Sequence, residues 1–204
     1  MDRPATYTSD VAFTEVVKAI QSRKGSRPAY ARMEQGGSWE QSITPALKAE
    51  IEGQTSVFLA TANARGQPYV QHRGGPPGFL RVLDEHTIGF VDFAGNRQYI
   101  TQGNLEENAK AHLFLIDYLN RRRIKIWGTA RVDQENRALM QQLMPPAYKA
   151  RPEQALLFTV AAWDVNCPQH IPRRLDAADV AAVLDSRDRR IAELEAEVKR
   201  LRHG

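Results

Sequence analysis

The chain has 204 residues, 42% of them apolar and 25% charged, which is the composition of a globular protein with a buried core and excludes wholesale disorder. Its net charge of +4 suits an anionic small molecule as well as a nucleic acid. The uncharged apolar stretch at residues 56–62 is far shorter than the roughly 20 residues that cross a bilayer, and the N-terminus has no apolar signal segment. The lone cysteine, Cys167, fits a reducing compartment. We therefore expect a cytoplasmic protein with no membrane partner.

The first part of the chain has the pattern of short helices. Apolar residues recur at helical spacing within residues 9–24, and Gly25 is a stop signal. Residues 25–42 are predicted to form an ordered loop, and Thr44 followed by proline predicts the start of a second helix. We expect residues 1–53 to be a helical segment that packs on the domain that follows.

From residue 54 to residue 175 the sequence has the alternation of β-strands. Short apolar runs are separated by turn signals, with helical patterns near 97–108 and 134–143. The predicted strands are 56–62, 69–73, 79–83, 86–93, 111–118, 122–132 and 155–164. Six or seven short strands joined mainly by tight turns indicate an antiparallel barrel with flanking helices, not a parallel α/β sheet.

Residues 176–204 are predicted to form an amphipathic, coiled-coil-like helix. Apolar residues occur seven apart in two sets that are offset by three or four, with one arginine in the second set. The sets are Leu184, Ile191 and Val198, and Val180, Arg187, Leu194 and Leu201. Read as a and d positions, they form about three heptads. Two alternatives follow: a two-stranded contact between subunits, or a helix packed on its own barrel. No separate basic region precedes the heptads, which argues against a DNA-binding zipper.

Several familiar catalytic and metal-binding motifs are missing from the sequence. There is no phosphate-binding P-loop, no dinucleotide-binding glycine motif after a strand, no HExxH and no GxSxG. The five histidines have no metal-ligand spacing, so we expect no metal site. The remaining candidates are polar side chains where predicted strands end.

These polar side chains gather in four stretches, at residues 71–75, 95–99, 121–128 and 163–174. In the second stretch, the backbone N–H groups of an expected helix start lie beside Arg97 and suit a phosphate. In the third, alternation places Arg123 and Lys125 on one face of a strand. Each stretch alone is also explained by a solvated strand end, a helix cap or a core tryptophan. One phosphorylated, planar, aromatic ligand would use all four.

The same residues resemble the pyridoxamine 5′-phosphate oxidase-like split-barrel family. The resemblance covers well over half of the chain and is carried by the motifs Gly66-Gln67-Pro68-Tyr69, Gly95-Asn96-Arg97-Gln98 and Arg122–Gly128. It implies a six-stranded antiparallel split barrel and a homodimer with two FMN sites at its interface. The candidate FMN-binding residues are then Gln71, His72, Arg73, Asp92, Asn96, Arg97, Gln98, Arg123, Lys125, Trp163 and Arg173.

The resemblance further implies an FMN-dependent oxidoreductase that acts on a small molecule. The family oxidase has an arginine and a histidine for its substrate where this chain has Gln169 and Ile171, which predicts a substrate other than pyridoxamine 5′-phosphate. His170 lies between them and is the candidate catalytic acid or base, because an unperturbed imidazole titrates near neutrality.

Three alternatives to a flavin enzyme remain at this point. The first is a non-catalytic flavin carrier or sensor that signals through its C-terminal helix. The second is a heme-binding relative of the same barrel, which would need an axial ligand such as histidine. The third, a nucleic-acid-binding module, depends only on the basic charge and the arginine cluster, and we expect no nucleic-acid partner.

Overall fold

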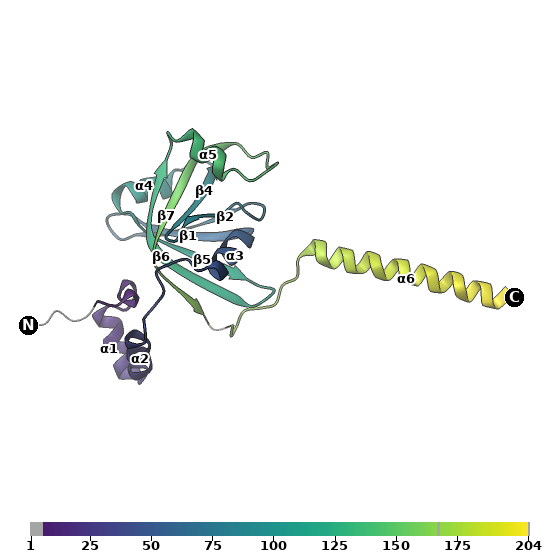
Figure 1. The fold of residues 1–204 in the computed structure, drawn as a ribbon, viewed down its shortest axis with the longest axis horizontal. Coiled ribbons are helices and arrows are strands. Elements are labelled where there is room, and N and C mark those ends of the chain that lie inside the picture. Colours follow the sequence, from purple (N-terminus) through teal and green to yellow (C-terminus); the bar gives the residue numbers. More distant parts are fainter. Residues whose placement is uncertain (1–5, 167, 204) are drawn as a thin grey trace, which may run out of the picture. The chain divides into compact units, whose positions relative to one another are not determined.

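A computed structural model describes residues 6–166 and 168–203 (Figure 1). The described residues of Met1–Ile116 and Arg123–Cys167 form one compact unit, and those of Asp117–Arg122 and Pro168–Gly204 form a second. The first unit holds most of the sheet and the helices that cover it. The second holds the C-terminal helix.

The sheet has seven strands, and every strand pair with a described register is antiparallel. The strands are β1 (Ser56–Ala62), β2 (Pro68–Gly74), β3 (Arg81–Asp84), β4 (Thr87–Phe93), β5 (Lys110–Asp117), β6 (Arg122–Asp133) and β7 (Pro152–Asn166). Their order across the sheet is β2-β1-β5-β6-β7-β4-β3. The mainly β, antiparallel fold is therefore confirmed. The seven strands correspond to the seven predicted from alternation, with β3 at the predicted strand 79–83, whereas the barrel implied by the family resemblance has six strands, one fewer than this sheet.

The core follows from the alternation of the strands. Val57 and Leu59 on β1 are fully buried, and Ile124 and Ile126 on β6 are at most 2% exposed. They belong to one apolar cluster that also takes in side chains of β4, β5 and β7 and the helix α3 (Pro45–Gly53). Removing this much apolar surface from water is the main force that holds the sheet together.

The N-terminal region contains a 3₁₀ turn (Thr8–Val11) and the helices α1 (Glu15–Lys24) and α2 (Arg27–Gln35). Gly25 ends α1 in the left-handed conformation, and Thr44 caps α3 by accepting a hydrogen bond from the Leu47 amide. These two signals were predicted correctly. The ordered loop expected at residues 25–42 was wrong, because α2 starts there with a proline in its first turn, the position at which proline favours a helix.

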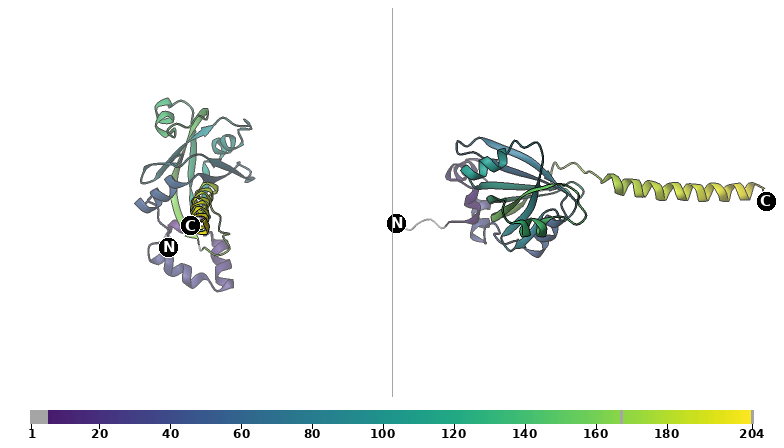
Figure 2. Two further views of the ribbon diagram at one scale, coloured as in Figure 1. Left: turned by 90° about the vertical axis from the view of Figure 1, so that its right-hand side faces the viewer. Right: turned by 90° about the horizontal axis from the view of Figure 1, so that it is seen from above.

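Aromatic contacts attach the N-terminal region to the sheet. The rings of Trp39 and Trp127 stack with their centroids 4.6 Å apart, and Trp163 Nε1 donates to the Ser42 carbonyl at 3.0 Å. Figures 1 and 2 show α1 and α2 together at the end of the sheet that is remote from α5 (Arg137–Leu143).

Two further helices complete the described structure: α4 (Ile100–Glu107), which follows β4, and α6 (Ala177–His203), which makes up most of the second unit. No helix within residues 6–166 or 168–203 combines the length and the hydropathy that crossing a membrane requires.

Candidate functional site

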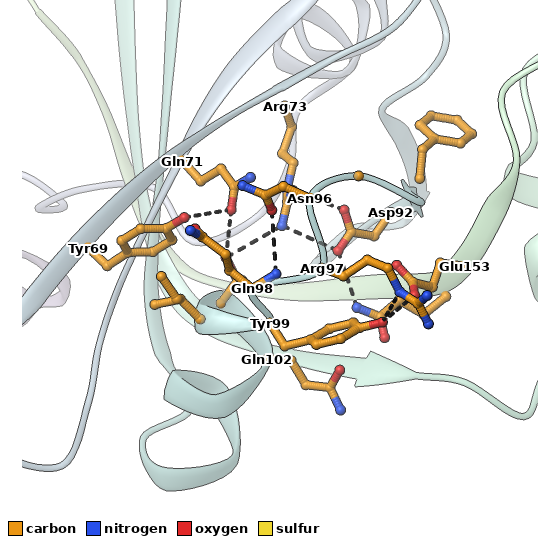
Figure 3. A pocket seen from close by; sticks show the side chains of 15 residues that line it. Tyr69, Gln71, Arg73, Asp92, Asn96, Arg97, Gln98, Tyr99, Gln102 and Glu153 are labelled. Carbon is orange, nitrogen blue, oxygen red and sulfur yellow. Dashed lines mark hydrogen bonds and ion pairs between the residues drawn. The ribbon is translucent and has the colours of Figure 1, made fainter.

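A cavity of about 310 Å³ lies between β2, β4, the loop at residues 94–99 and the start of α4 (Figure 3). Its walls are mostly polar. Six of the predicted FMN-binding residues line it: Gln71, Arg73, Asp92, Asn96, Arg97 and Gln98. The structure thus brings together side chains from two strands and a loop that the sequence placed at separate strand ends.

The alternation of β2 decides which of its side chains enter the cavity. Gln71 and Arg73 share one face of the strand, and the intervening His72 lies on the other. His72 Nε2 is 2.7 Å from Ser56 Oγ, and its ring packs edge-on against Phe58. The structure therefore does not place His72 with the other candidate residues.

At the base of the cavity, Arg73 forms a two-pronged ion pair with Asp92. The Nη1–Oδ1 and Nη2–Oδ2 distances are 3.1 Å and 3.2 Å, and Gln154 Nε2 also donates to Asp92 Oδ2 at 3.2 Å. Burial raises the pKa of Asp92, and the charge of Arg73 acts in the opposite direction. Arg73 Nε is buried and has no hydrogen-bond acceptor within the described part of the chain. It is therefore a buried donor that the described chain leaves unsatisfied.

The loop at residues 94–99 supplies the exposed cation of the site. Arg97 Nε donates to the Tyr99 hydroxyl at 3.0 Å, and that hydroxyl donates to Glu153 Oε1 at 2.8 Å. The hydrogen bond to Tyr99 raises the pKa of Arg97. Both Arg97 and Tyr99 have positive φ angles, near +59° and +54°, a conformation that costs energy outside glycine and clusters at functional sites. The loop thus holds a solvated guanidinium at the cavity mouth.

Formal charges at the cavity nearly balance. Arg73 is neutralised by Asp92, and the carboxylate of Glu153 reaches Arg97 through Tyr99. An anion that enters therefore depends on Arg97 for attraction and on Arg73 Nε and nearby amides for hydrogen bonds.

Six polar residues that line this cavity are not among the predicted FMN-binding residues: Tyr69, Tyr99, Thr101, Gln102, Glu153 and Gln154. Tyr69 and Thr101 both donate to Gln71 Oε1, at 2.9 Å and 3.4 Å, and so orient that amide. Glu153 and Gln154 lie on β7 and reach the cavity because β7 pairs with β4, with Gln154 opposite Asp92. The alternation of β2 places Tyr69 on the same face as Gln71 and could have indicated it as a cavity residue. No local sequence signal indicates Glu153 or Gln154.

Lys125 and Trp163 lie together in a different place. They line a second cavity of about 580 Å³ with Asp164, whose carboxylate is 2.9 Å from Lys125 Nζ. That ammonium also lies over the rings of Trp39 and Trp127, at 5.5 Å and 5.1 Å from their centroids. In this chain the charge of Lys125 is therefore directed to Asp164 and to aromatic faces, away from the first cavity.

The remaining candidate residues are not among those that line the first cavity. Arg123 is on β6, in register with Asn166 on β7. His170 and Arg173 belong to the second compact unit, and both are exposed. Their roles toward a cofactor stay predictions.

The profile described as pyridoxamine 5′-phosphate oxidase matches residues 43–167, more than half of the chain. The chain belongs to this family. The matched range of this pyridoxamine 5′-phosphate oxidase family member begins just before α3, covers the whole sheet and includes every residue of the first cavity. The predicted family is confirmed.

Solved structures similar to this family member include proteins with different described roles. HupZ of Group A Streptococcus is 21% identical, with 65% of this chain and 99% of that chain covered and a TM-score of 0.48. An FMN-binding protein of Syntrophomonas wolfei is 12% identical (74% and 97% covered, TM-score 0.45). The heme storage protein HutZ of Vibrio cholerae is 14% identical (61% and 93% covered, TM-score 0.41). No curated protein matches the chain.

Proposed function

We propose that this protein binds FMN, with the FMN phosphate at Arg97, and works as an FMN-dependent oxidoreductase on a small molecule. The observation that carries the proposal is the convergence of Arg97, Asn96, Gln98 and the unsatisfied Nε of Arg73 on one cavity. Phosphate groups are bound by such guanidinium and amide donors.

The donor set and the size of the cavity both fit part of FMN. Ligand pockets usually span roughly 300–1,000 Å³, and this one is at the low end, at about 310 Å³. That space suits the phosphate and the polar chain attached to it. The aromatic ring would then need a further wall, and a homodimer with the site at its interface, as the family resemblance implies, would supply one.

Each residue has a distinct part in holding the cofactor. Arg97 supplies the charge that attracts the phosphate, because it is the exposed cation of the cavity. Arg73 is fixed by Asp92 and donates through Nε. Gln71 is oriented by Tyr69 and Thr101, which turns its amide nitrogen away from them. Bound FMN supplies the hydride or electron transfer itself.

The test is a titration of the apoprotein with FMN, followed by absorption and by quenching of flavin fluorescence. Arg97→Ala should weaken binding by about tenfold or more, since charge-assisted contacts are the strong ones. Arg65→Ala, in the exposed turn between β1 and β2, is the matched control and should leave affinity unchanged. Absence of a flavin spectrum and of any rise in melting temperature at high FMN would overturn the proposal.

Catalysis needs a separate measurement. Anaerobic addition of NADH or NADPH to the FMN-loaded protein should bleach the flavin, and oxygen or an added acceptor should restore it. If the protein binds FMN but NADH and NADPH do not reduce it, and no acceptor reoxidises it, the carrier or sensor alternative is favoured. A Soret band after heme addition, with no affinity for FMN, would favour the heme-binding alternative.

A further inference from the structure

The C-terminal helix α6 presents a row of apolar side chains that no other residue of its own compact unit covers. All 27 of its residues are exposed. Six large apolar residues of the row are between 38% and 77% exposed: Val180, Leu184, Ile191, Leu194, Val198 and Leu201. Helices in proteins gain most of their stability by packing such a row against a partner.

We propose that α6 pairs with α6 of a second copy of this chain, in parallel and in register, as a two-stranded coiled coil. The row follows a four-three spacing along the helix, with Arg187 as its one charged member, and Figure 1 shows α6 as one uninterrupted helix. In heptad terms, the a positions are Ala177, Leu184, Ile191 and Val198, and the d positions are Val180, Arg187, Leu194 and Leu201.

The residue types at these positions favour two parallel strands. The last two a positions hold the β-branched Ile191 and Val198, and the last two d positions hold Leu194 and Leu201. β-Branched residues at a with leucine at d are the combination that favours parallel dimers. The C-terminal half of α6 is therefore the stronger half of the proposed coil.

Charges beside the apolar row agree with a parallel arrangement. In a parallel dimer, a g residue faces the e residue five positions later on the other helix. Arg190 then faces Glu195 of the second copy, and Glu197 faces Arg202 of the second copy. Each pair occurs twice by symmetry, which gives four attractive contacts and no repulsive one among the charged g–e pairs.

The antiparallel arrangement that overlaps the same row is less favourable. It brings Leu184 opposite Leu201 of the second copy, and e residues then face e residues. Asp188 would face Glu195 of the second copy, a repulsive pair that occurs twice and offsets the attractive pair of Arg190 with Glu197, which the facing g residues would form twice, so that this arrangement has no net gain from charge pairs. Like charges directly opposite one another disfavour a wrong pairing.

Arg187 explains why the coil would hold one register. In the parallel dimer, the two Arg187 side chains share a layer, with Asp188 at the adjacent e position of each helix. A single polar residue in a coiled-coil core lowers stability but specifies register and partner number. Arg190 forms an exposed pair with Glu193 of its own helix at 2.9 Å, and an exposed pair of this kind is easily exchanged.

The experiment measures disulfide formation in the full-length protein, in which the native Cys167 is replaced by serine. Leu201→Cys places a thiol at a core position, and Arg189→Cys places one on the outer face as the matched control. In a parallel, in-register coil, two Leu201→Cys chains should cross-link about tenfold faster or more than two Arg189→Cys chains, because the coil raises the effective concentration of one thiol pair. If the chain dimerises through its sheet alone, the cross-linking rate should not depend on the heptad position of the cysteine.

Two results would overturn the proposal. One is equal cross-linking of Leu201→Cys and Arg189→Cys. The other is preferential cross-linking between Leu184→Cys and Leu201→Cys in a mixture, which reports the antiparallel arrangement.

A charge exchange tests the pairing independently. In the Leu201→Cys background, Arg190→Glu should slow cross-linking, and adding Glu195→Arg in the same chain should restore it. Positions 190 and 195 are five apart and do not face each other within one helix, so the rescue reports a contact between helices. Failure of the second substitution to restore the rate would contradict the predicted pairing.

Discussion

Arg73 and Asp92 form a two-pronged ion pair, although four strands separate β2 from β4 in the order of the sheet. Side chains on two such distant strands touch only if the sheet curls until these strands approach each other. The pair therefore links the two sides of the curved sheet and at the same time forms the base of the candidate FMN site.

We predict that Asp92→Asn lowers the free energy of unfolding by about 2–3 kcal/mol, because it leaves the guanidinium of Arg73 largely buried without its counter-charge. Urea unfolding at neutral pH measures the change. Glu193→Gln, which breaks an exposed helix pair, is the control and should have little effect. A change below about 0.5 kcal/mol for Asp92→Asn would show that the pair does not hold the sheet together.

The second prediction concerns Glu153, which lies at the end of the hydrogen-bond chain from Arg97 through Tyr99. Glu153→Gln removes a negative charge from the wall of a cavity proposed to hold a phosphate. FMN affinity should rise about threefold to fivefold at low ionic strength and by less at high salt, because salt screens exposed charges. Fluorescence titration at two salt concentrations checks both effects. If Glu153→Gln binds FMN with unchanged or lower affinity, the proposed position of the phosphate near Arg97 is contradicted.

Local sequence patterns predicted most of the fold because most of it depends on local signals. The strand positions follow from alternation, and Gly25 and Thr44 mark helix ends through their own backbone and side-chain chemistry. The helix α2 was missed because it is short and mostly polar, so that the proline near its start is its clearest helix signal. Its place is set by contacts with residues far along the chain, such as the ring of Phe13 against Tyr30.

The site was predicted only in part, for a similar reason. Alternation on β2 separates Gln71 and Arg73 from His72, and this could have been read from the sequence. Gln154 enters the cavity only through the pairing of β4 with β7, 62 residues away from Asp92. Lys125 carries the expected charge, but its partners Asp164 and Trp39 hold it at another cavity, which Trp163 also lines.

The third prediction is a pH dependence of stability that comes from His112. This histidine on β5 lies edge-on to Trp127, at 5.0 Å between ring centroids. Burial, together with the charge of Lys125, lowers its pKa to about 4. In the unfolded chain its pKa is near 6.5, so below that pH the unfolded state binds a proton that the folded state does not. The contribution of His112 to the free energy of unfolding is therefore fully present above pH 6.5 and is lost as the pH falls toward 4.

His112→Gln should remove this contribution. Between pH 7.5 and pH 5, the wild-type protein should lose about 2 kcal/mol more free energy of unfolding than the variant. Urea unfolding at the two pH values measures the difference, and His203→Gln, at the exposed end of α6, is the control. Identical pH dependence in the wild type and in His112→Gln would show that His112 is not desolvated in the folded protein.

The fourth prediction tests the irregular point of the sheet, where the register of β6 against β7 shifts between Trp127 and Gly128. A Cβ atom at Gly128 would lie 2.0 Å from the Thr159 carbonyl oxygen and 2.7 Å from the buried ring of Phe158. Since backbone and a core ring cannot both move away cheaply, Gly128→Ala should lower the free energy of unfolding by about 3 kcal/mol. Gly53→Ala meets open space at the end of α3 and should stabilise by about 0.5–1 kcal/mol. Thermal and urea unfolding measures the free energy of unfolding of both variants. Equal changes in Gly128→Ala and Gly53→Ala would mean that the register shift at Gly128 leaves room for a side chain.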